Sequence, residues 1–351
     1  MTTIKSNTYN IFIEQNGFIA IHKFLTKKVY DKYVIICDEN SSQYCMPQLL
    51  LACKTLNTAE IIEIESGEKN KTIETCIQVW GALTDIGADK KSLIINLGGG
   101  VISDLGGFVA SAFKRGIDFI NIPTTLLSMV DASVGGKTGI DFEGIKNHIG
   151  STYEPKGVFI NIAFLDSLSE RHIKNGYAEI IKIALIADNT FWNALKKIKR
   201  FKEFYSKKII IKAIELKNNI VKKDLKETHL RKSLNFGHNV GHALESSFIK
   251  QNKDILHGEA IAYGMLIESE IAFDAKKISK KELAEIKKYI HSIYKKISLS
   301  SATKKLLLEF ILHDKKNEGS HLCFALPKSI GNFELYCDVK IIEIENALNK
   351  E

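Results

Sequence analysis

The sequence predicts an α/β protein of two domains, a Rossmann-like domain of parallel strands followed by an all-α domain. Short apolar runs alternate with helical stretches in the first half, and long segments with 3.6-residue periodicity dominate the second. The chain has 351 residues, and at roughly 150 residues per domain this length suggests two domains. We place the domain boundary where strand-like apolar runs give way to segments with helical periodicity, which gives domains at residues 1–164 and 165–351.

Five runs of the first half have the length and composition of β-strands. They are residues 33–38, 60–64, 92–97, 119–122 and 158–162. Between the second and third runs, Ile73, Ile77, Trp80 and Leu83 recur at helical spacing and predict an amphipathic helix. Strands that alternate with helices pair in parallel, which predicts the Rossmann-like layer. In the second half, stretches such as 201–226 and 280–297 predict helices.

Composition excludes several classes of protein. With 45% hydrophobic and 26% charged residues and only 4 prolines, the chain is neither disordered nor fibrous. The apolar tract 92–113 is interrupted by Asp104 and by five glycines, so we expect no membrane span. The start of the chain lacks the features of a secretory signal, and the six cysteines form no C-x-x-C pair. We therefore expect reduced thiols in a cytoplasmic protein.

The net charge of +8 suggests an anionic partner. The lysine clusters at 196–200 and 287–288 lie in helix-like segments without interleaved aromatic residues, which is typical of solvated helix faces. We therefore expect no nucleic acid as partner, and a small anionic ligand is the remaining class.

Two glycine-rich segments could bind phosphate. The run Gly98-Gly99-Gly100 follows an apolar strand and enters a helix-like segment, where backbone N–H groups can hold a phosphate. The spacing is not G-x-G-x-x-G, so a purely steric turn is the alternative. Asp38 ends a strand, where it could bind ribose hydroxyls or simply form a turn.

The second glycine-rich segment, 123–147, places Lys137 and Lys146 on loops, where they could meet anions or remain solvated. A P-loop is excluded because Asp131 stands where its first glycine would be.

Histidines and an acid of the second half suggest a metal site. His238 and His242, at i and i+4, project from one helical face, and His257 precedes an apolar helix. Glu179 lies three residues before Lys182 on another helix. Histidines with one carboxylate suit a zinc-type catalytic site with an open position. The segment lacks the Glu of H-E-x-x-H, which disfavours a metalloprotease, and hydrogen-bonded core histidines are the alternative.

Ordered motifs make the chain similar to the 3-dehydroquinate synthase family of sugar-phosphate cyclases. The resemblance runs through residues 67–71, 98–104, 113–116, 123–128, 131–138, 146–147, 176–182, 234–245, 257–265 and 314–316. It implies an NAD-binding α/β domain, an α-helical metal domain, an active site in the cleft between them, and a homodimer. The implied reaction converts 3-deoxy-D-arabino-heptulosonate 7-phosphate to 3-dehydroquinate and phosphate with catalytic NAD.

The resemblance also implies roles for individual residues. Glu179, His238 and His257 would hold Zn²⁺ or Co²⁺. The NAD site would use Asp38, Glu68, Lys71, Gly99, Gly100, Val101, Asp104, Thr124, Thr125, Lys137, Lys146, Leu165 and Ser167. Substrate would meet Asp131, Lys137, Lys146, Asn147, Lys182, Lys217, Arg231, Asn235, His242 and one of Lys315 or Lys316, with Arg115 reaching from a partner subunit. The catalytic set would be Lys137, Lys182, Arg231, Asn235 and His242, with His242 carrying protons or supporting the metal.

The chain departs from the family pattern at Asn161, Ile162, Ser167, Ser169, His172, Asn239 and Thr152. Ser167 keeps a hydroxyl, so we expect small effects on NAD placement. The alternatives are a sibling cyclase of the 2-deoxy-scyllo-inosose or valiolone type, a metal-dependent polyol dehydrogenase, and a non-catalytic nucleotide-binding module.

Overall fold

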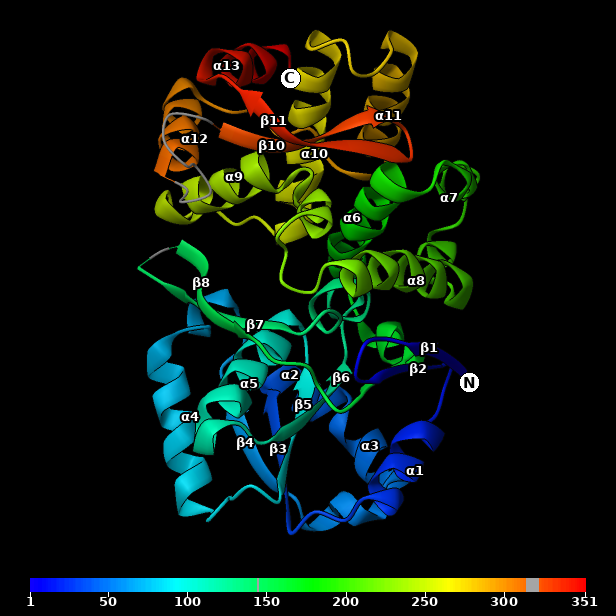
Figure 1. The fold of residues 1–351 in the computed structure, drawn as a ribbon, viewed down its shortest axis with the longest axis vertical. Coiled ribbons are helices and arrows are strands. Elements are labelled where there is room, and N and C mark those ends of the chain that lie inside the picture. Colours follow the sequence, from blue (N-terminus) through cyan, green and yellow to red (C-terminus); the bar gives the residue numbers. More distant parts are fainter. Residues whose placement is uncertain (144, 314–321) are drawn as a thin grey trace. The chain divides into compact units, whose positions relative to one another are not determined.

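The computed structural model describes residues 1–143, 145–313 and 322–351 and divides the chain into two compact units, Met1–Ser169 and Glu170–Glu351. The first unit is α/β and the second is mainly helical, as predicted (Figure 1). The boundary between the two units lies after residue 169, whereas the sequence predicted it after residue 164. The reason is local: the short 3-10 helix η5 (Ile162–Ser167) belongs to the first unit, where the N–H of Ala163 donates to the carbonyl of Gln15 at 3.0 Å.

A seven-stranded sheet forms the centre of the first unit, in the order β1-β2-β9-β6-β5-β3-β4. Its strands are β1 (Thr2–Lys5), β2 (Asn10–Glu14), β9 (Val158–Asn161), β6 (Asp118–Pro123), β5 (Ser92–Gly98), β3 (Lys32–Asp38) and β4 (Glu60–Ile64). All five predicted strands are present and pair in parallel. The edge pair β1 and β2 is antiparallel and was not predicted, and β2 joins the sheet through a parallel pairing with β9.

The helices of the first unit pack against this sheet. They are α1 (Ile19–Lys27), α2 (Glu39–Tyr44), α3 (Met46–Ala52), α4 (Ile73–Asp85) and α5 (Gly100–Ala112), with short turns η1 (Lys54–Thr58), η2 (Glu68–Asn70), η3 (Phe113–Arg115) and η4 (Ser128–Ala132). The predicted amphipathic helix is α4. Its Leu83 joins Val109 of α5 and Ile94 of β5 in one core cluster. The carboxyl ends of β3 and β5 lead directly into α2 and α5.

A hairpin of β7 (Lys137–Phe142) and β8 (Ile145–Thr152) packs on α5 and was not predicted. Its segment is rich in glycine, which conceals a strand pattern. The glycines are needed for close packing: a Cβ at Gly139 would lie 2.7 Å from the carbonyl oxygen of Ile149 on the paired strand.

In the second unit, α10 packs against α6, α9, α11 and α13. The helices are α6 (Glu170–Ala187), α7 (Asn189–Leu195), α8 (Lys207–Lys223), α9 (His238–Lys250), α10 (His257–Asp274), α11 (Lys280–Ile293), α12 (Ser301–His313) and α13 (Ile341–Lys350), with turns η6 (Phe201–Tyr205) and η7 (Leu230–Asn235). Most of α10 is buried, which agrees with the apolar run at residues 260–267 of its sequence. Within the described residues, no helix combines the length and apolar character needed to cross a membrane.

The all-α description of the second unit needs a correction, because β10 (Leu322–Ser329) and β11 (Asn332–Val339) form an antiparallel hairpin. Pro327 lies inside β10 next to a shift of register, and it weakens the strand pattern in the sequence. Gly331, at φ +88°, makes the turn between the two strands.

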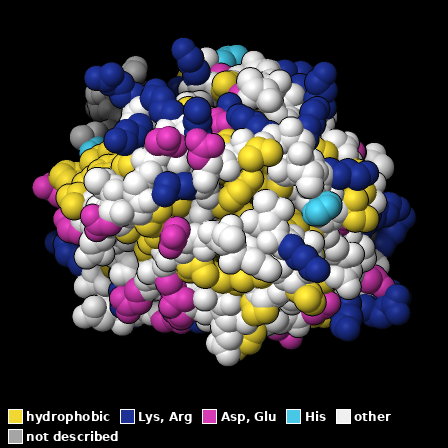
Figure 2. Space-filling model, turned by 90° about the horizontal axis from the view of Figure 1, so that it is seen from below, with side chains coloured by type: hydrophobic (Ala, Val, Ile, Leu, Met, Phe, Trp, Pro, Cys, Tyr) yellow, Lys and Arg dark blue, Asp and Glu magenta, His cyan; other side chains and the backbone are white. Residues whose placement is uncertain are grey.

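One face of the surface carries charges of both signs. On the face seen in Figure 2, basic side chains are interspersed with acidic and hydrophobic ones.

Candidate active site

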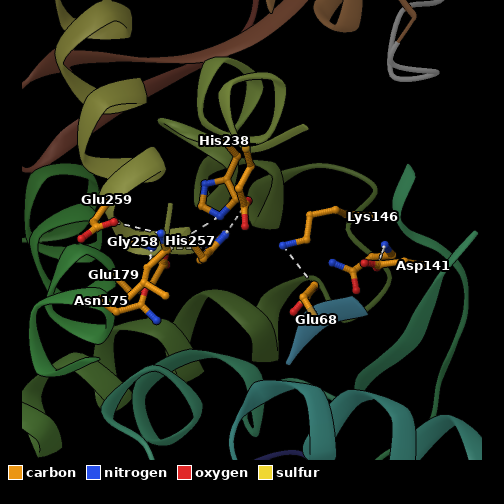
Figure 3. A network of polar contacts seen from close by, with 12 residues as sticks. Glu68, Asp141, Lys146, Asn175, Glu179, His238, His257, Gly258 and Glu259 are labelled. Atoms are coloured by element: carbon orange, nitrogen blue, oxygen red, sulfur yellow. Dashed lines mark hydrogen bonds and ion pairs between the residues drawn. The ribbon is translucent and has the colours of Figure 1, made fainter. Parts of the chain in front are cut away.

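Three helices of the second unit bring the predicted metal ligands together. His238 and His242 on α9 and His257 on α10 offer ring nitrogens that lie within 4.8 Å of one another. Glu179 on α6 points at the same place, and its Oε1 lies 3.7 Å from the Nε2 atoms of both His238 and His257 (Figure 3). One carboxylate and three imidazoles therefore converge, although their segments are far apart in the sequence.

Local sequence explains how these helices approach so closely. Gly237, at φ +80°, precedes α9, and a Cβ at Gly264 of α10 would lie 2.0 Å from the carbonyl oxygen of Gly237. A Cβ at Gly258 would lie 2.0 Å from the carbonyl oxygen of Asn175 on α6. The amide oxygen of Asn175 also accepts a hydrogen bond from the N–H of Gly258. Glycine is therefore required at both helix crossings.

Glu179 has the environment expected of a metal ligand. Its side chain is buried, and its Oε2 forms an ion pair with Lys182. Among the described residues, no hydrogen bond reaches its Oε1, the atom that faces the two histidines. A buried carboxylate oxygen without a hydrogen-bond donor is costly unless a cation binds it. The residues thus fit a divalent cation held by Glu179, His238 and His257.

The other ring nitrogen of both histidines is held in place. His257 Nδ1 lies 3.2 Å from Oε2 of the buried Glu245, and His238 Nδ1 lies 3.2 Å from the carbonyl oxygen of Phe236. An acceptor at Nδ1 fixes the tautomer and leaves the Nε2 lone pair for a metal. Glu245 was not predicted, because its contact with His257 joins α9 to α10 and leaves no local pattern in the sequence.

The basic residues predicted to bind substrate lie on elements next to this cluster. Lys182 is on α6, Lys217 on α8 and Arg231 on η7, and these three elements contact one another in pairs. All three side chains are buried. Buried cations need anionic partners. The helical unit thus holds three buried cations on elements that contact one another, and one of them, Lys182, pairs with Glu179.

A rigid loop positions Arg231 and Asn235. The carboxylate of Asp224 accepts hydrogen bonds from the backbone N–H groups of Thr228, His229 and Arg231 at 2.7 to 3.0 Å. Burial opposes ionisation of Asp224, but these bonds outweigh it and lower its pKa to about 2. The Arg231 guanidinium donates to the carbonyl of Leu225 at 2.8 Å. The amide of Asn235 donates to Glu227 at 2.8 Å.

In the first unit, several residues predicted to bind NAD form one polar network. Lys71 is buried and donates to Asp104 at 2.7 Å and to the amide oxygen of Asn147 at 2.6 Å. Lys146 forms an ion pair with Glu68 at 3.1 Å (Figure 3). Burial opposes the charge of Lys71, but the carboxylates of Asp104 and Glu68 outweigh it and raise its pKa.

Asp141 of β7 belongs to the same network and was not predicted. Its Oδ1 accepts from the N–H of Asn147 at 2.8 Å, and its own N–H donates to the carbonyl of Lys71. Burial and the nearby charge of Glu68 raise the pKa of Asp141 to about 6. No sequence pattern marks Asp141, because its role depends on how the hairpin folds over α5.

The glycine-rich turn joins β5 to α5. Gly99 precedes the first residue of α5, and a Cβ there would lie 3.3 Å from Cγ2 of Thr125. The N–H of Thr124 donates to the carbonyl of Gly98 at 2.9 Å, which joins the ends of β5 and β6. Asp38 ends β3 and caps α2, accepting from the N–H of Ser41 at 2.7 Å. This cap is the turn role that the sequence left open.

The remaining predicted residues lie on several elements. Val101 lies in the first turn of α5, Asp131 in η4, Leu165 and Ser167 in η5, the exposed Lys137 in β7 and the exposed Arg115 in η3. Ser167 donates to the carbonyl of Phe164 at 3.1 Å. Lys315 and Lys316 lie outside the described residues.

Comparisons with known proteins agree with this arrangement. The family models described as 3-dehydroquinate synthase N-terminal and C-terminal match residues 61–175 and 176–317. A 3-dehydroquinate synthase of Parabacteroides distasonis is 41% identical over 92% of this chain and 93% of its own length. One from Helicobacter pylori (strain P12) is 37% identical over 99% of this chain and 97% of its own length.

Solved structures share the fold. A 2-epi-5-epi-valiolone synthase from Streptomyces hygroscopicus, with NAD⁺ and Zn²⁺ bound, superposes with a TM-score of 0.86 at 25% identity, covering 100% of this chain and 98% of its own. A 2-deoxy-scyllo-inosose synthase in complex with carbaglucose-6-phosphate, NAD⁺ and Co²⁺ superposes with a TM-score of 0.84 at 22% identity, covering 99% of each chain. An iron-containing alcohol dehydrogenase from Thermotoga maritima is more distant, with a TM-score of 0.64 at 14% identity over 99% of this chain and 98% of its own.

Proposed function

The chain belongs to the 3-dehydroquinate synthase family, and on that premise we propose that it converts 3-deoxy-D-arabino-heptulosonate 7-phosphate to 3-dehydroquinate and inorganic phosphate. The enzyme would be a carbon–oxygen lyase acting on a phosphate, in the shikimate route to chorismate and the aromatic amino acids. The observation that carries the proposal is the approach of Glu179 Oε1 to the Nε2 atoms of His238 and His257, at 3.7 Å each, beside the buried Lys182.

We propose NAD and a divalent cation, Zn²⁺ or Co²⁺, as cofactors. When bound, NAD⁺ supplies a reversible hydride acceptor and the cation supplies Lewis-acid stabilisation of a substrate oxygen. The cation would be held by Glu179, His238 and His257. NAD would be held by the Gly99 turn and by the network of Glu68, Lys71, Asp104 and Lys146, with further contacts from Asp38, Gly100, Val101, Thr124, Thr125, Lys137, Leu165 and Ser167.

The substrate has two anionic ends, a carboxylate and a phosphate, and the chain offers fixed positive charge for both. Lys182, Lys217 and Arg231 are buried on mutually contacting elements, so their charges are preorganised rather than solvated. Arg231 can bind a carboxylate or phosphate through two parallel N–H donors. Lys137 and Lys146 of the first unit would add further contacts, together with Asp131, Asn147, Asn235 and one of Lys315 or Lys316.

His242 is our candidate for moving protons. Its ring centroid lies 5.0 Å from that of His238 and 5.7 Å from that of His257, so it adjoins the metal site. An imidazole titrates near neutral pH and can take a proton from a substrate C–H or return one to an oxygen. Glu179 completes a ligand set of one carboxylate and two histidines without His242, which leaves this ring for proton transfer.

Two rival functions differ in what they release. A sibling cyclase would use another sugar phosphate, whereas a polyol dehydrogenase would release NADH and would have no anionic substrate groups to bind with the buried Lys182, Lys217 and Arg231. We favour the synthase because relatives at 36 to 41% identity over most of the chain carry that name.

One assay separates these functions. Purified protein, NAD⁺, Zn²⁺ or Co²⁺ and the heptulosonate phosphate are incubated, and phosphate and NADH are followed together. We expect phosphate release without net NADH. Net NADH without phosphate would identify a dehydrogenase, and a metal-loaded protein that releases no phosphate would refute the proposal.

We further propose that the chain acts as a homodimer in the cytoplasm. Five of the six cysteines are buried, and all six are free, which suits a reducing compartment. The exposed Arg115, at φ +62°, stands on the surface where it could reach the substrate of a partner subunit. Sedimentation of the purified protein tests the dimer, and a monomer would exclude this role for Arg115.

A further inference from the structure

A carboxylate from α10 caps the helix that carries two of the clustered histidines. Oε2 of Glu268 accepts a hydrogen bond from the N–H of Gly237 at 2.6 Å, and Oε1 accepts from the N–H of Val240 at 3.2 Å. These N–H groups flank His238, the first residue of α9. Glu268 is fully buried, so water does not serve these donors in its place. One side chain thus fixes the first turn of α9 against α10.

This contact has geometric consequences for the metal site. α10 begins at His257, and α9 begins at His238. The two backbones meet at Gly237 and Gly264, so the helices touch without side chains between them. Because Glu268 bridges the same two helices, it fixes the position of His238 relative to His257. Loss of the bridge would leave two buried N–H donors unsatisfied, and α9 would have to move to satisfy them.

Charge gives Glu268 a second effect. Two of the proposed ligands are the first residues of their helices, and a helix N-terminus carries about half a positive charge. Two such termini beside a divalent cation disfavour its binding. Each terminus has a carboxylate: Glu268 binds the start of α9, and Glu259 accepts from the N–H of Leu256 at 2.9 Å at the start of α10. An ionised carboxylate at each position would offset the dipole, and Glu259 shares its charge with Arg171, with which it forms an ion pair at 2.8 Å.

We propose that Glu268 is a positioning residue for the metal site, which holds the His238 end of α9 and offsets its positive terminus. The inference rests on the proposed function, because it assumes that the histidine cluster binds a divalent cation. It predicts that metal affinity depends on a side chain that does not itself reach the metal.

Glu268→Gln is the sharpest test. Glutamine keeps the shape of the side chain but replaces one acceptor oxygen with an NH₂ donor, which would face a backbone N–H. We expect the affinity for Co²⁺ and Zn²⁺, measured by chelator competition, to fall by about 10- to 100-fold, as for other outer-shell changes. The visible absorption bands of the Co²⁺-loaded protein should shift as well. A Gln variant with wild-type affinity and an unchanged spectrum would overturn the inference.

Glu270→Gln is the matched control. Glu270 is also buried on α10, but it pairs with Lys287 at 2.7 Å and with Lys350 at 3.6 Å, away from α9. We expect this variant to lose stability and to keep wild-type metal affinity. If it loses as much metal affinity as Glu268→Gln, the effect is general loosening of α10 and the inference is wrong.

Two further measurements keep the test decisive. If Glu268→Gln does not fold, as judged by far-UV circular dichroism, Glu268→Asp takes its place. We expect a smaller loss of metal affinity in Glu268→Asp because the carboxylate is kept. Wild-type metal affinity in Glu268→Asp would overturn the inference. Wild-type protein that binds neither metal would refute the proposed metal site itself. Wild-type protein that binds metal beside an unaffected Gln variant would refute only the role of Glu268.

Discussion

Adding one methyl group at Gly258 should separate the two helices that hold Glu179 and His257. A Cβ there would lie 2.0 Å from the carbonyl oxygen of Asn175, 2.7 Å from its carbonyl carbon and 2.8 Å from its Cα. Ordinary van der Waals contact begins at 3.4 Å, so α10 must shift by about 1.4 Å or α6 must yield. The obstacle is backbone, which cannot rotate away as a side chain can.

The size of this shift determines the expected effect of Gly258→Ala. His257 adjoins Gly258, and metal ligands tolerate errors of only about 0.2 Å in their distances. A displacement several times larger should reduce Co²⁺ and Zn²⁺ affinity by more than the roughly 10- to 100-fold typical of outer-shell changes. Overpacking should also cost about 1–3 kcal/mol in the free energy of unfolding.

Gly81→Ala in α4 is the control, because a Cβ there meets nothing within 4 Å. Alanine in a helix interior is favoured over glycine, so this variant should gain about 0.5–1 kcal/mol and keep its metal affinity. The assay is chelator competition together with urea unfolding, with and without metal. A Gly258→Ala protein with wild-type metal affinity would refute the claim that the α6 and α10 crossing sets the ligand geometry.

Three other predictions concern single side chains. His242→Ala should lose turnover and retain metal, as measured by phosphate release and metal content; near-normal turnover would exclude proton transfer by His242. Lys71→Met should cost about 3 kcal/mol in the free energy of unfolding because it leaves Asp104 unpaired, whereas Lys69→Met breaks an exposed pair and should cost at most about 0.5 kcal/mol. Because the pKa of Asp141 is raised to about 6 in the folded protein, the folded state binds a proton at this carboxyl at a higher pH than the unfolded state does. The free energy of unfolding of wild type should therefore rise relative to that of Asp141→Asn as the pH falls through about 6. Parallel pH profiles of the two proteins would contradict this.

The parallel sheet was predictable because its strands are continuous apolar runs. All of Ser92–Gly98 is buried, and the apolar run of β5 is interrupted only by Asn96, whose amide donates to Asn121 of β6. The hairpins escaped prediction for the opposite reason. Glycines in β7 and β8 and Pro327 in β10 break the patterns that identify strands, yet they satisfy close packing and a register shift.

The residues of the candidate site likewise differ in how far the sequence could predict them. His238 and His242 are neighbours on one helix, so their spacing in the sequence was enough to pair them. The sequence singled out Glu179 as a candidate acid, but its place beside the histidines depends on the packing of α6 against α10. Glu245, Asp141 and Glu268 depend on contacts between elements that no local pattern records.

The central claim, that NAD is used and regenerated in a cyclisation, is tested most directly by product stoichiometry. Metal-loaded protein is given a large excess of the heptulosonate phosphate over NAD⁺, and 3-dehydroquinate and NADH are measured at completion. We predict that 3-dehydroquinate exceeds the NAD⁺ added many times over and that no NADH accumulates. Product limited to one equivalent of NAD⁺, with matching NADH, would contradict the account.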